Sequence, residues 1–470
     1  MAAGVWRRLS SDCPIMSKST FFKQLFLSGA ILPLAVSCSQ PEAPIPDVLE
    51  SYLVDHSSKP QYEKGYDAYF DLSDGLLSAY QVPGISNCLK SVVNKITGNA
   101  DCDGIFTLKN SEIAKCELRQ TDLYNYILAP ASYQMIAPIE QSLAQITGAG
   151  RAALFVTDFE EYSGGVIQQQ NYAKQYFIDW LSRGNRIVFF VFDYKEGAKA
   201  KHLYFTVFDT PEHLLLKDVE LALEGNGATY ATFRLGNGEV AFSNSYASST
   251  VGGSYHDAAT GEDIISLTKE DGEGDCYARF EALNAEFYPF MESMPNIVQN
   301  IADAKEPGSD YTPAFSHLLS GLKADFSAMS GYDVKRLDVR VSDIQDDYDT
   351  YAGFYELKSD SVAIAVLPDS AKGRVTDVPD AFVFAGSVSD GVADIAVDFR
   401  DGFKGQSASF AEGDLLRVDV VMAECAPRYD VLPALFEWDG NRSLIEAVKN
   451  TLQAQNPQGR VVYSYFIKCI

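Results

Sequence analysis

The sequence predicts an α/β doubly wound N-terminal domain followed by a β-rich, sandwich-like C-terminal region. Three observations support this fold class. Apolar runs alternate with helical patterns up to about residue 224, several of these runs end in aspartate, and turn pairs with alternating strands multiply from about residue 225. Near-continuous apolar strands are typical of a sheet that is covered on both faces. Strand, helix and strand in succession predict right-handed parallel crossovers.

The strands of the first domain are expected at four apolar runs: residues 66–70, 152–157, 186–192 and 202–208. An aspartate follows each run: Asp71, Asp158, Asp193 and Asp209. Helices are expected where apolar side chains recur at intervals of three and four residues: 85–96, 136–146 and 172–181. The segment Lys109-Asn110-Ser111 separates two short strands and predicts a hairpin.

The aspartates that end these strands are candidate binding residues. Ligands of doubly wound sheets lie beyond the carboxyl ends of the strands, where the strand order reverses. We therefore expect Asp71 and Asp158 to converge at one edge of the sheet, although they are some ninety positions apart. Each aspartate also fits the simpler role of a helix N-cap.

The loop Asp71-Leu72-Ser73-Asp74-Gly75 and the strand ending in Thr157-Asp158 resemble a von Willebrand factor type A domain over roughly residues 60–220. Such domains carry a metal-ion-dependent adhesion site, built from an Asp-x-Ser-x-Ser loop, a threonine and a Thr-Asp-Gly loop. The resemblance implies that Asp71, Ser73 and Asp158 bind Mg²⁺ or Ca²⁺, with Ser132 and Glu160 as further candidate ligands.

Three features depart from the family pattern. Where the family has its threonine, before the second helix, the segment 129–133 offers only the aliphatic hydroxyl of Ser132. Gly75 stands where the first loop has its last serine, and Phe159 stands where the third loop has glycine. A metal-free site is therefore the alternative. If two carboxylates face each other without a cation, their mutual repulsion must be relieved by hydrogen bonds or by a raised pKa of one of them.

The remainder of the chain divides into a mixed bridging region, 225–330, and a β-sandwich-like domain, 331–470. Residues 281–330 have a more helical pattern. A helix is expected at 443–452. Strands are expected at 361–367, 381–384, 393–399, 415–421 and 461–467.

The N-terminus has the features of a secretory signal. Lys18 and Lys23 precede an apolar stretch, and Ala35-Val36-Ser37-Cys38 resembles the lipobox of bacterial lipoproteins. The resemblance implies a signal peptide with an over-extended start, residues 1–37, a lipidated Cys38, a tether, 38–59, and a protein anchored at the outer membrane or cell surface. The alternative is an ordinary cleaved signal with an incidental cysteine.

Charge and cysteine content limit the functional classes. The chain has 64 acidic and 38 basic residues, a net charge of −26, which argues against nucleic-acid binding.

Six cysteines follow Cys38, namely Cys88, Cys102, Cys116, Cys276, Cys425 and Cys469. Disulfides and buried free thiols both remain open for them. Their spacings include no CxxC pair, which argues against a zinc site.

The sequence contains no GxSxG, HExxH or P-loop motif, which favours a non-catalytic function. The main hypothesis is an envelope adhesion-type lipoprotein that recognises a protein or glycan partner through a divergent metal-dependent site. The second is a non-catalytic scaffold with a degenerate metal site. The third is a hydrolase in which Asp71, Asp158 and Glu160 surround a metal-activated water.

Overall fold

A computed structural model describes most of the chain from residue 64 onward. The described ranges are 64–163, 166–211, 215–236, 240–244, 250–251, 254–256, 263–266, 276–283, 286–293, 319–358, 372–378, 382–399, 415–438 and 441–469. The predicted signal peptide, Cys38, the tether and the predicted strand 361–367 lie outside these residues.

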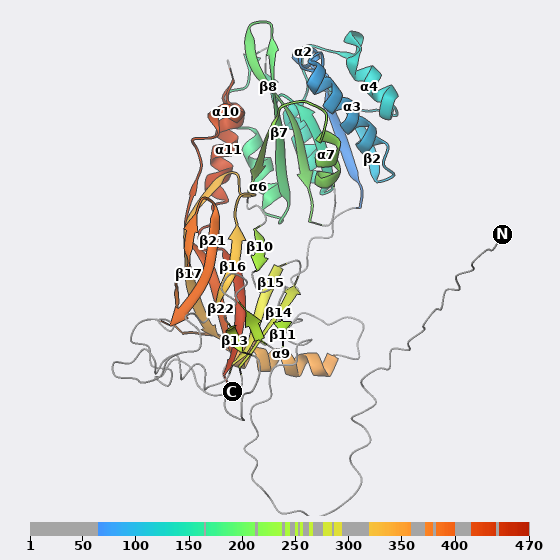
Figure 1. The fold of residues 1–470 in the computed structure, drawn as a ribbon. Helices are drawn as coiled ribbons and strands as arrows, with labels where there is room; N and C mark the ends of the chain where they lie inside the picture. The colour runs from blue at the N-terminus through green and yellow to red at the C-terminus, as the bar shows by residue number, and fades with distance from the viewer. Residues whose placement is uncertain are drawn as a thin grey trace, which may run out of the picture. The chain divides into compact units, whose positions relative to one another are not determined.

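The N-terminal half is built on a mixed seven-stranded sheet in the order β3-β2-β1-β4-β8-β7-β9 (Figure 1). The strands are β1 Tyr66–Asp71, β2 Cys102–Lys109, β3 Glu112–Lys115, β4 Ala152–Thr157, β7 Arg186–Glu196, β8 Lys199–Asp209 and β9 Ala231–Leu235. β1 is parallel to both β2 and β4, and the other neighbouring pairs are antiparallel. The α/β fold class is therefore confirmed.

Helices cover both faces of this sheet, so every residue of β1 and of β4 is buried. The helices on one face are α2 Asp74–Tyr80, α3 Pro83–Thr97, α4 Gln120–Leu128 and α7 Leu215–Leu223. Those on the other face are α5 Ile139–Ala149 and α6 Ala173–Leu181. A short 3₁₀ helix, Pro130–Ser132, follows α4. Two separate apolar clusters result, one on each side of the sheet.

The three predicted helices and the predicted hairpin are confirmed. α3 begins with Pro83 at its first position, where a missing N–H costs no hydrogen bond. α5 ends at Gly150, whose φ of 67° is the left-handed conformation that commonly terminates a helix. The β2–β3 hairpin turns at Asn110, which also has a positive φ.

The expected parallel arrangement is wrong for residues 186–209. β7 and β8 form an antiparallel hairpin with Gly197 at its turn, and the pairing places Asp209 opposite Arg186. Asp209 consequently lies at the end of the sheet away from Asp158. The physical reason is the short connection, because a parallel crossover needs a dozen or more residues.

The C-terminal half contains a five-stranded sheet and a six-stranded sheet, in the orders β10-β16-β21-β19, with β20 on β21, and β14-β15-β23-β22-β17-β18. The strands of the first are β10 Ala241–Asn244, β16 Leu319–Asp325, β19 Phe382–Phe384, β20 Ser387–Ser389 and β21 Val392–Phe399. Those of the second are β14 Cys276–Leu283, β15 Glu286–Ser293, β17 Tyr332–Asp343, β18 Thr376–Asp377, β22 Leu415–Pro427 and β23 Val461–Cys469. Buried side chains from both sheets share one apolar cluster.

Smaller elements complete the described chain: the pair β5 Tyr162–Ser163 and β6 Val166–Ile167, the three-stranded sheet β11 Thr250–Val251, β12 Ser254–His256 and β13 Asp263–Ser266, and α9 Gln345–Lys358.

The predicted strands at 381–384, 393–399, 415–421 and 461–467 are confirmed. The helical pattern expected at 281–330 is wrong wherever the structure describes it, because β15 and β16 lie there. Aromatic residues at Phe287, Tyr288 and Phe290 favour a strand over a helix.

The C-terminal helices α10 Pro433–Phe436 and α11 Ser443–Ala454 pack against the N-terminal half. α11 lies beside α6, as Figure 1 shows. The ring of Phe436 stacks on Tyr204 of β8 with a centroid distance of 5.9 Å. These helices therefore cover a part of the sheet face that α5 and α6 leave open, and the predicted helix at 443–452 is confirmed.

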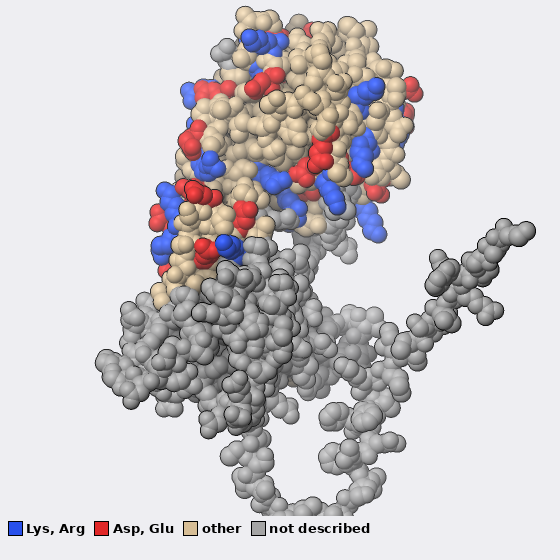
Figure 2. All heavy atoms as spheres, viewed as in Figure 1, with Lys and Arg blue, Asp and Glu red and all other residues tan. Residues whose placement is uncertain are grey.

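The surface charges are mixed. On the face shown in Figure 2, Lys and Arg side chains lie among Asp and Glu side chains. Within the described ranges, no helix is both long enough and apolar enough to cross a membrane.

Candidate buried carboxylate–lysine site

Asp71 and Asp158 converge, as the sequence predicted. β1 and β4 are parallel neighbours with Phe70 opposite Val156, so their carboxyl ends lie side by side. The hydroxyl of Thr157 donates to Asp71 Oδ2 over 2.8 Å. Asp71 and Asp158 have 0 % and 1 % of their surface exposed, so both carboxyl groups are inside the protein.

The first loop holds Asp71 by local geometry. The backbone N–H of Ser73 donates to Asp71 Oδ1 over 2.8 Å, which gives the tight turn that begins α2. Ser73 also forms an isolated parallel bridge with Gln134, from the loop after the 3₁₀ helix. The hydroxyl of Ser132 donates instead to the carbonyl of Tyr126, and the structure shows no hydrogen bond between it and Asp71 or Asp158.

Phe159 lies in the loop that follows β4 and has an unusual backbone conformation. Its φ of 56° lies in the left-handed region, which costs a non-glycine residue about 1 kcal/mol. Its ring is fully buried and makes edge contacts with Phe155, Phe177 and Tyr204. Aromatic pairs contribute about 0.5–1.5 kcal/mol each, so packing offsets the backbone strain. Position 159 is therefore occupied by a core residue.

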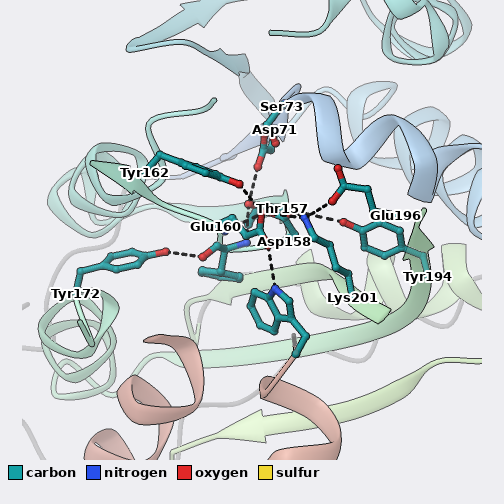
Figure 3. A network of polar contacts seen from close by, with 12 residues as sticks. Asp71, Ser73, Thr157, Asp158, Glu160, Tyr162, Tyr172, Tyr194, Glu196 and Lys201 are labelled. Carbon is teal, nitrogen blue, oxygen red and sulfur yellow. Dashed lines mark hydrogen bonds and ion pairs between the residues drawn. The ribbon is translucent and has the colours of Figure 1, made fainter. Parts of the chain in front are cut away.

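Lys201 from β8 is the centre of the site (Figure 3). Its Nζ lies 2.9 Å from Glu160 Oε2, 2.6 Å from Glu196 Oε2 and 3.8 Å from Asp158 Oδ2. The lysine side chain is only 4 % exposed. A buried ammonium needs nearby negative charge and hydrogen-bond acceptors, and these three carboxylates supply both.

The chain's own donors satisfy Glu160. Tyr162 donates to Glu160 Oε2 over 3.0 Å, and the indole N–H of Trp438 donates to Oε1 over 3.0 Å. Trp438 belongs to the C-terminal half and lies 278 positions away in the sequence. The two halves of the chain therefore meet at this carboxylate.

The chain's own donors also satisfy Asp158. The N–H of Glu160 donates to Asp158 Oδ1 over 3.0 Å, and the hydroxyl of Tyr194 donates to Oδ2 over 3.3 Å. Tyr80 differs from these residues: its hydroxyl is fully buried and has no hydrogen-bond partner in the described part of the chain.

Burial dominates the electrostatics of the site. It raises the pKa of Asp71 to about 6, although hydrogen bonds from Ser73 and Thr157 favour the ionised form. Burial and the charges of Glu160 and Asp71 raise the pKa of Asp158 well above its usual range. Burial alone would lower the pKa of Lys201, but Asp158, Glu196 and Glu160 outweigh it, so the pKa is raised and the ammonium persists.

Two carboxylates of this site contact an ammonium. Mg²⁺ requires about six oxygens in a near-octahedral shell, and Ca²⁺ requires six to eight. Here the Lys201 ammonium already lies within hydrogen-bonding distance of Glu160 and Glu196. Within the described ranges, no three or more His, Cys, Asp or Glu side chains are grouped so that they could hold a metal.

The sequence prediction missed Lys201, Glu196, Tyr194 and Trp438. One signal was available for Lys201. In β8 it lies in phase with Leu203 and Phe205, both fully buried, so alternation places a lysine on the inward face of the hairpin.

Four cysteines are free thiols: Cys88, Cys102 and Cys425 are buried and Cys116 is half-buried. Burial raises the pKa of the three buried thiols to about 11. The free-thiol alternative therefore holds for these four positions. The side chains of Cys276 and Cys469 lie outside those that the structure describes.

Comparisons with protein-family models, with curated proteins and with solved structures found no match.

Proposed function

We propose that this chain is a non-catalytic binding or scaffold lipoprotein of the cell envelope, with a type A-like N-terminal domain whose carboxylate site is closed by the protein itself. One observation carries this proposal. Asp71, Asp158 and Glu160 are at most 6 % exposed, and every one of their carboxylate oxygens accepts a hydrogen bond from the chain.

The arrangement of elements from β1 to β4 supports the type A-like assignment. A strand ending in Asp71, helices, a hairpin, another helix and a strand ending in Thr157-Asp158 follow one another in the order that the resemblance implies. The antiparallel β7–β8 hairpin departs from the doubly wound pattern and supplies Lys201. The proposed domain thus has the loops that carry Asp71 and Asp158, but a hairpin lysine lies beside the second loop.

The same geometry weighs against hydrolysis as the function. A catalytic carboxylate must reach the reacting atoms, directly or through one water. Asp158 is 1 % exposed, and its oxygens already accept hydrogen bonds from the Glu160 N–H and the Tyr194 hydroxyl. We therefore place partner recognition on other surfaces of the protein.

Lipid anchoring through Cys38 is part of the proposal and is supported by the lipobox-like sequence before it. One acyl chain gives marginal membrane binding, so stable anchoring requires more than one. Metabolic labelling with an alkyne fatty acid should mark the wild-type chain and leave Cys38→Ala unmarked. Equal labelling of both chains would remove the anchor from the proposal.

The proposed mode of recognition is tested by cation dependence. The full chain, solubilised in detergent, is applied to a glycan array and to separated envelope proteins, once with MgCl₂ and CaCl₂ and once with EDTA. We expect the same bound partners under both conditions. Loss of binding in EDTA, restored by either cation, would favour metal-dependent adhesion instead.

A further inference from the structure

Two strands of the C-terminal half, one from each large sheet, enclose a groove of about 460 Å³. Residues 335–338 of β17 form one wall, and residues from the segment 383–388, in β19 and β20, form the other. This volume falls within the range of about 300–1,000 Å³ that is typical of ligand sites. The groove contains no residue of the carboxylate–lysine site, so it is a separate candidate for recognition.

The groove runs along strand edges. β17 pairs with β22 on one side, whereas on the other side β18 pairs only with Ser342 and Asp343. β19 and β20 pair only with β21. Within the described ranges, the second edge of β17 at residues 335–338 therefore has no partner strand. An unpaired edge offers backbone donors and acceptors to a further strand.

The β17 wall of the groove contains a bulge. Val334 and Arg336 pair with consecutive residues of β22, so Lys335 is an extra residue with no partner opposite it. Neighbouring side chains of a regular strand point to opposite faces. Here Lys335 and Arg336 are both exposed and both line the groove. A bulge re-aims side chains in this way, and it brings two cations to one place.

The groove residues only partly balance this positive charge. Arg336 donates to Asp338 Oδ2 over 3.0 Å, and the N–H of Val339 donates to Oδ1 of the same carboxylate over 2.8 Å. The side chains of Arg336 and Asp338 are 57 % and 45 % exposed, and such exposed pairs are weak. Lys335 has neither an ion pair nor a side-chain hydrogen bond in the described part of the chain. In a protein with a net charge of −26, these two cations favour an acidic partner.

The opposite wall offers apolar contacts. Phe384 and Val388 are half-buried, line the groove and pack against the apolar cluster that contains Leu337. An extended peptide presents alternate side chains to opposite sides. An acidic side chain can therefore lie beside Lys335 while the next, apolar side chain covers Phe384 and Val388.

We propose that this groove binds an extended acidic segment of a partner protein, which adds as a strand along the edge of β17. Backbone hydrogen bonds to the edge provide affinity, and contacts with Lys335, Arg336 and Phe384 provide specificity. The inference rests on the part of the proposed function that assigns partner recognition to surfaces away from the buried site. It adds the surface and the chemistry of the partner.

The test uses fluorescent synthetic hexapeptides and the full chain in detergent. One peptide alternates valine with glutamate, and a second has lysine in place of glutamate. A third has proline at its centre and lacks the N–H groups that strand pairing requires. An oligogalacturonate supplies negative charge without a peptide backbone. Fluorescence anisotropy measures binding at low and at high salt.

Lys335→Glu tests the charge of the groove. Lys323→Glu is the matched control, because Lys323 is exposed on β16 and does not line the groove. Wild type and the control should bind the glutamate peptide, more weakly at high salt. Lys335→Glu should bind it about tenfold more weakly and gain affinity for the lysine peptide.

Three results would overturn the inference. They are equal affinity of Lys335→Glu and Lys323→Glu for the glutamate peptide, undiminished binding of the proline peptide, and binding of the oligogalacturonate alone.

Hydrogen exchange of the wild-type chain locates the bound peptide without any variant. We expect slower amide exchange at residues 335–338 and 383–388 when the glutamate peptide is added. Unchanged exchange there, or protection only at other residues, would overturn the inference. If no peptide binds but the array or the separated envelope proteins yield a partner, the groove is excluded and the proposed function stands.

Discussion

Replacement of Lys201 by methionine tests the energetics of the buried site. Methionine keeps much of the lysine stem and removes the charge. In EDTA, the change leaves Asp158 and Glu160 facing each other without the cation, and loss of one partner of a buried ion pair costs about 3–5 kcal/mol. The Glu196 contact adds little, because that side chain is 38 % exposed and well solvated.

We therefore expect Lys201→Met to lower the free energy of unfolding by about 3–5 kcal/mol at pH 7. The loss should shrink as the pH falls, because burial raises the pKa of Asp158, which then takes up a proton and no longer needs a cation. Urea unfolding followed by circular dichroism measures it for wild type, Lys201→Met, Glu160→Gln and the double variant. If charge compensation is the cause, the double variant is more stable than Lys201→Met alone. A loss of less than about 1 kcal/mol, or no recovery in the double variant, would refute the reasoning.

Three further predictions concern the same core. Burial raises the pKa of Asp71 from 3.8 to about 6, so wild type should lose about 2 kcal/mol relative to Asp71→Asn as the pH rises from 4 to 6; parallel unfolding curves across this window contradict it. Trp438→Phe removes the N–H that donates to buried Glu160 and should cost about 2 kcal/mol in urea unfolding, whereas an unchanged midpoint would show that the contact contributes nothing. Under native conditions iodoacetamide should alkylate half-buried Cys116 well before Cys88, whose pKa burial raises to about 11; equal rates in peptide mass spectrometry would contradict this order.

Local sequence patterns were sufficient for much of the N-terminal half. The apolar positions of α3 recur every three or four residues, and the fully apolar core of β4 predicts a strand that is buried on both faces. Convergence of Asp71 and Asp158 followed from the rule that neighbouring parallel strands end at the same edge. These features depend on short stretches of chain, where residue type and spacing are informative.

The β7–β8 hairpin shows where that reasoning failed. The apolar pattern ends the first strand at Asp193 and begins the second at His202, but β7 continues through Glu196 and β8 begins at Lys199. With the turn at Gly197 recognised, an antiparallel pair would have been the only arrangement available. The antiparallel pairing also brings Lys201 to the site. The turn at Gly197 therefore determines both the strand direction and the position of the lysine.

The contact between Trp438 and Glu160 could not be predicted in this way. It joins residues 278 positions apart, and it depends on α10 and α11 packing against the sheet. No local period or motif encodes such a pairing. The role of Phe159 was equally inaccessible, because its left-handed backbone is stabilised by rings from four separate elements, including Phe189 of β7 and Tyr204 of β8.

A crystal structure of the wild-type protein, grown in MgCl₂ at high resolution, tests the central claim most directly. We predict electron density for Lys201 Nζ within hydrogen-bonding distance of Glu160 and Glu196, with no cation between Asp71, Ser73 and Asp158. A magnesium ion bound to those three residues, with the lysine turned out of the site, would contradict the account.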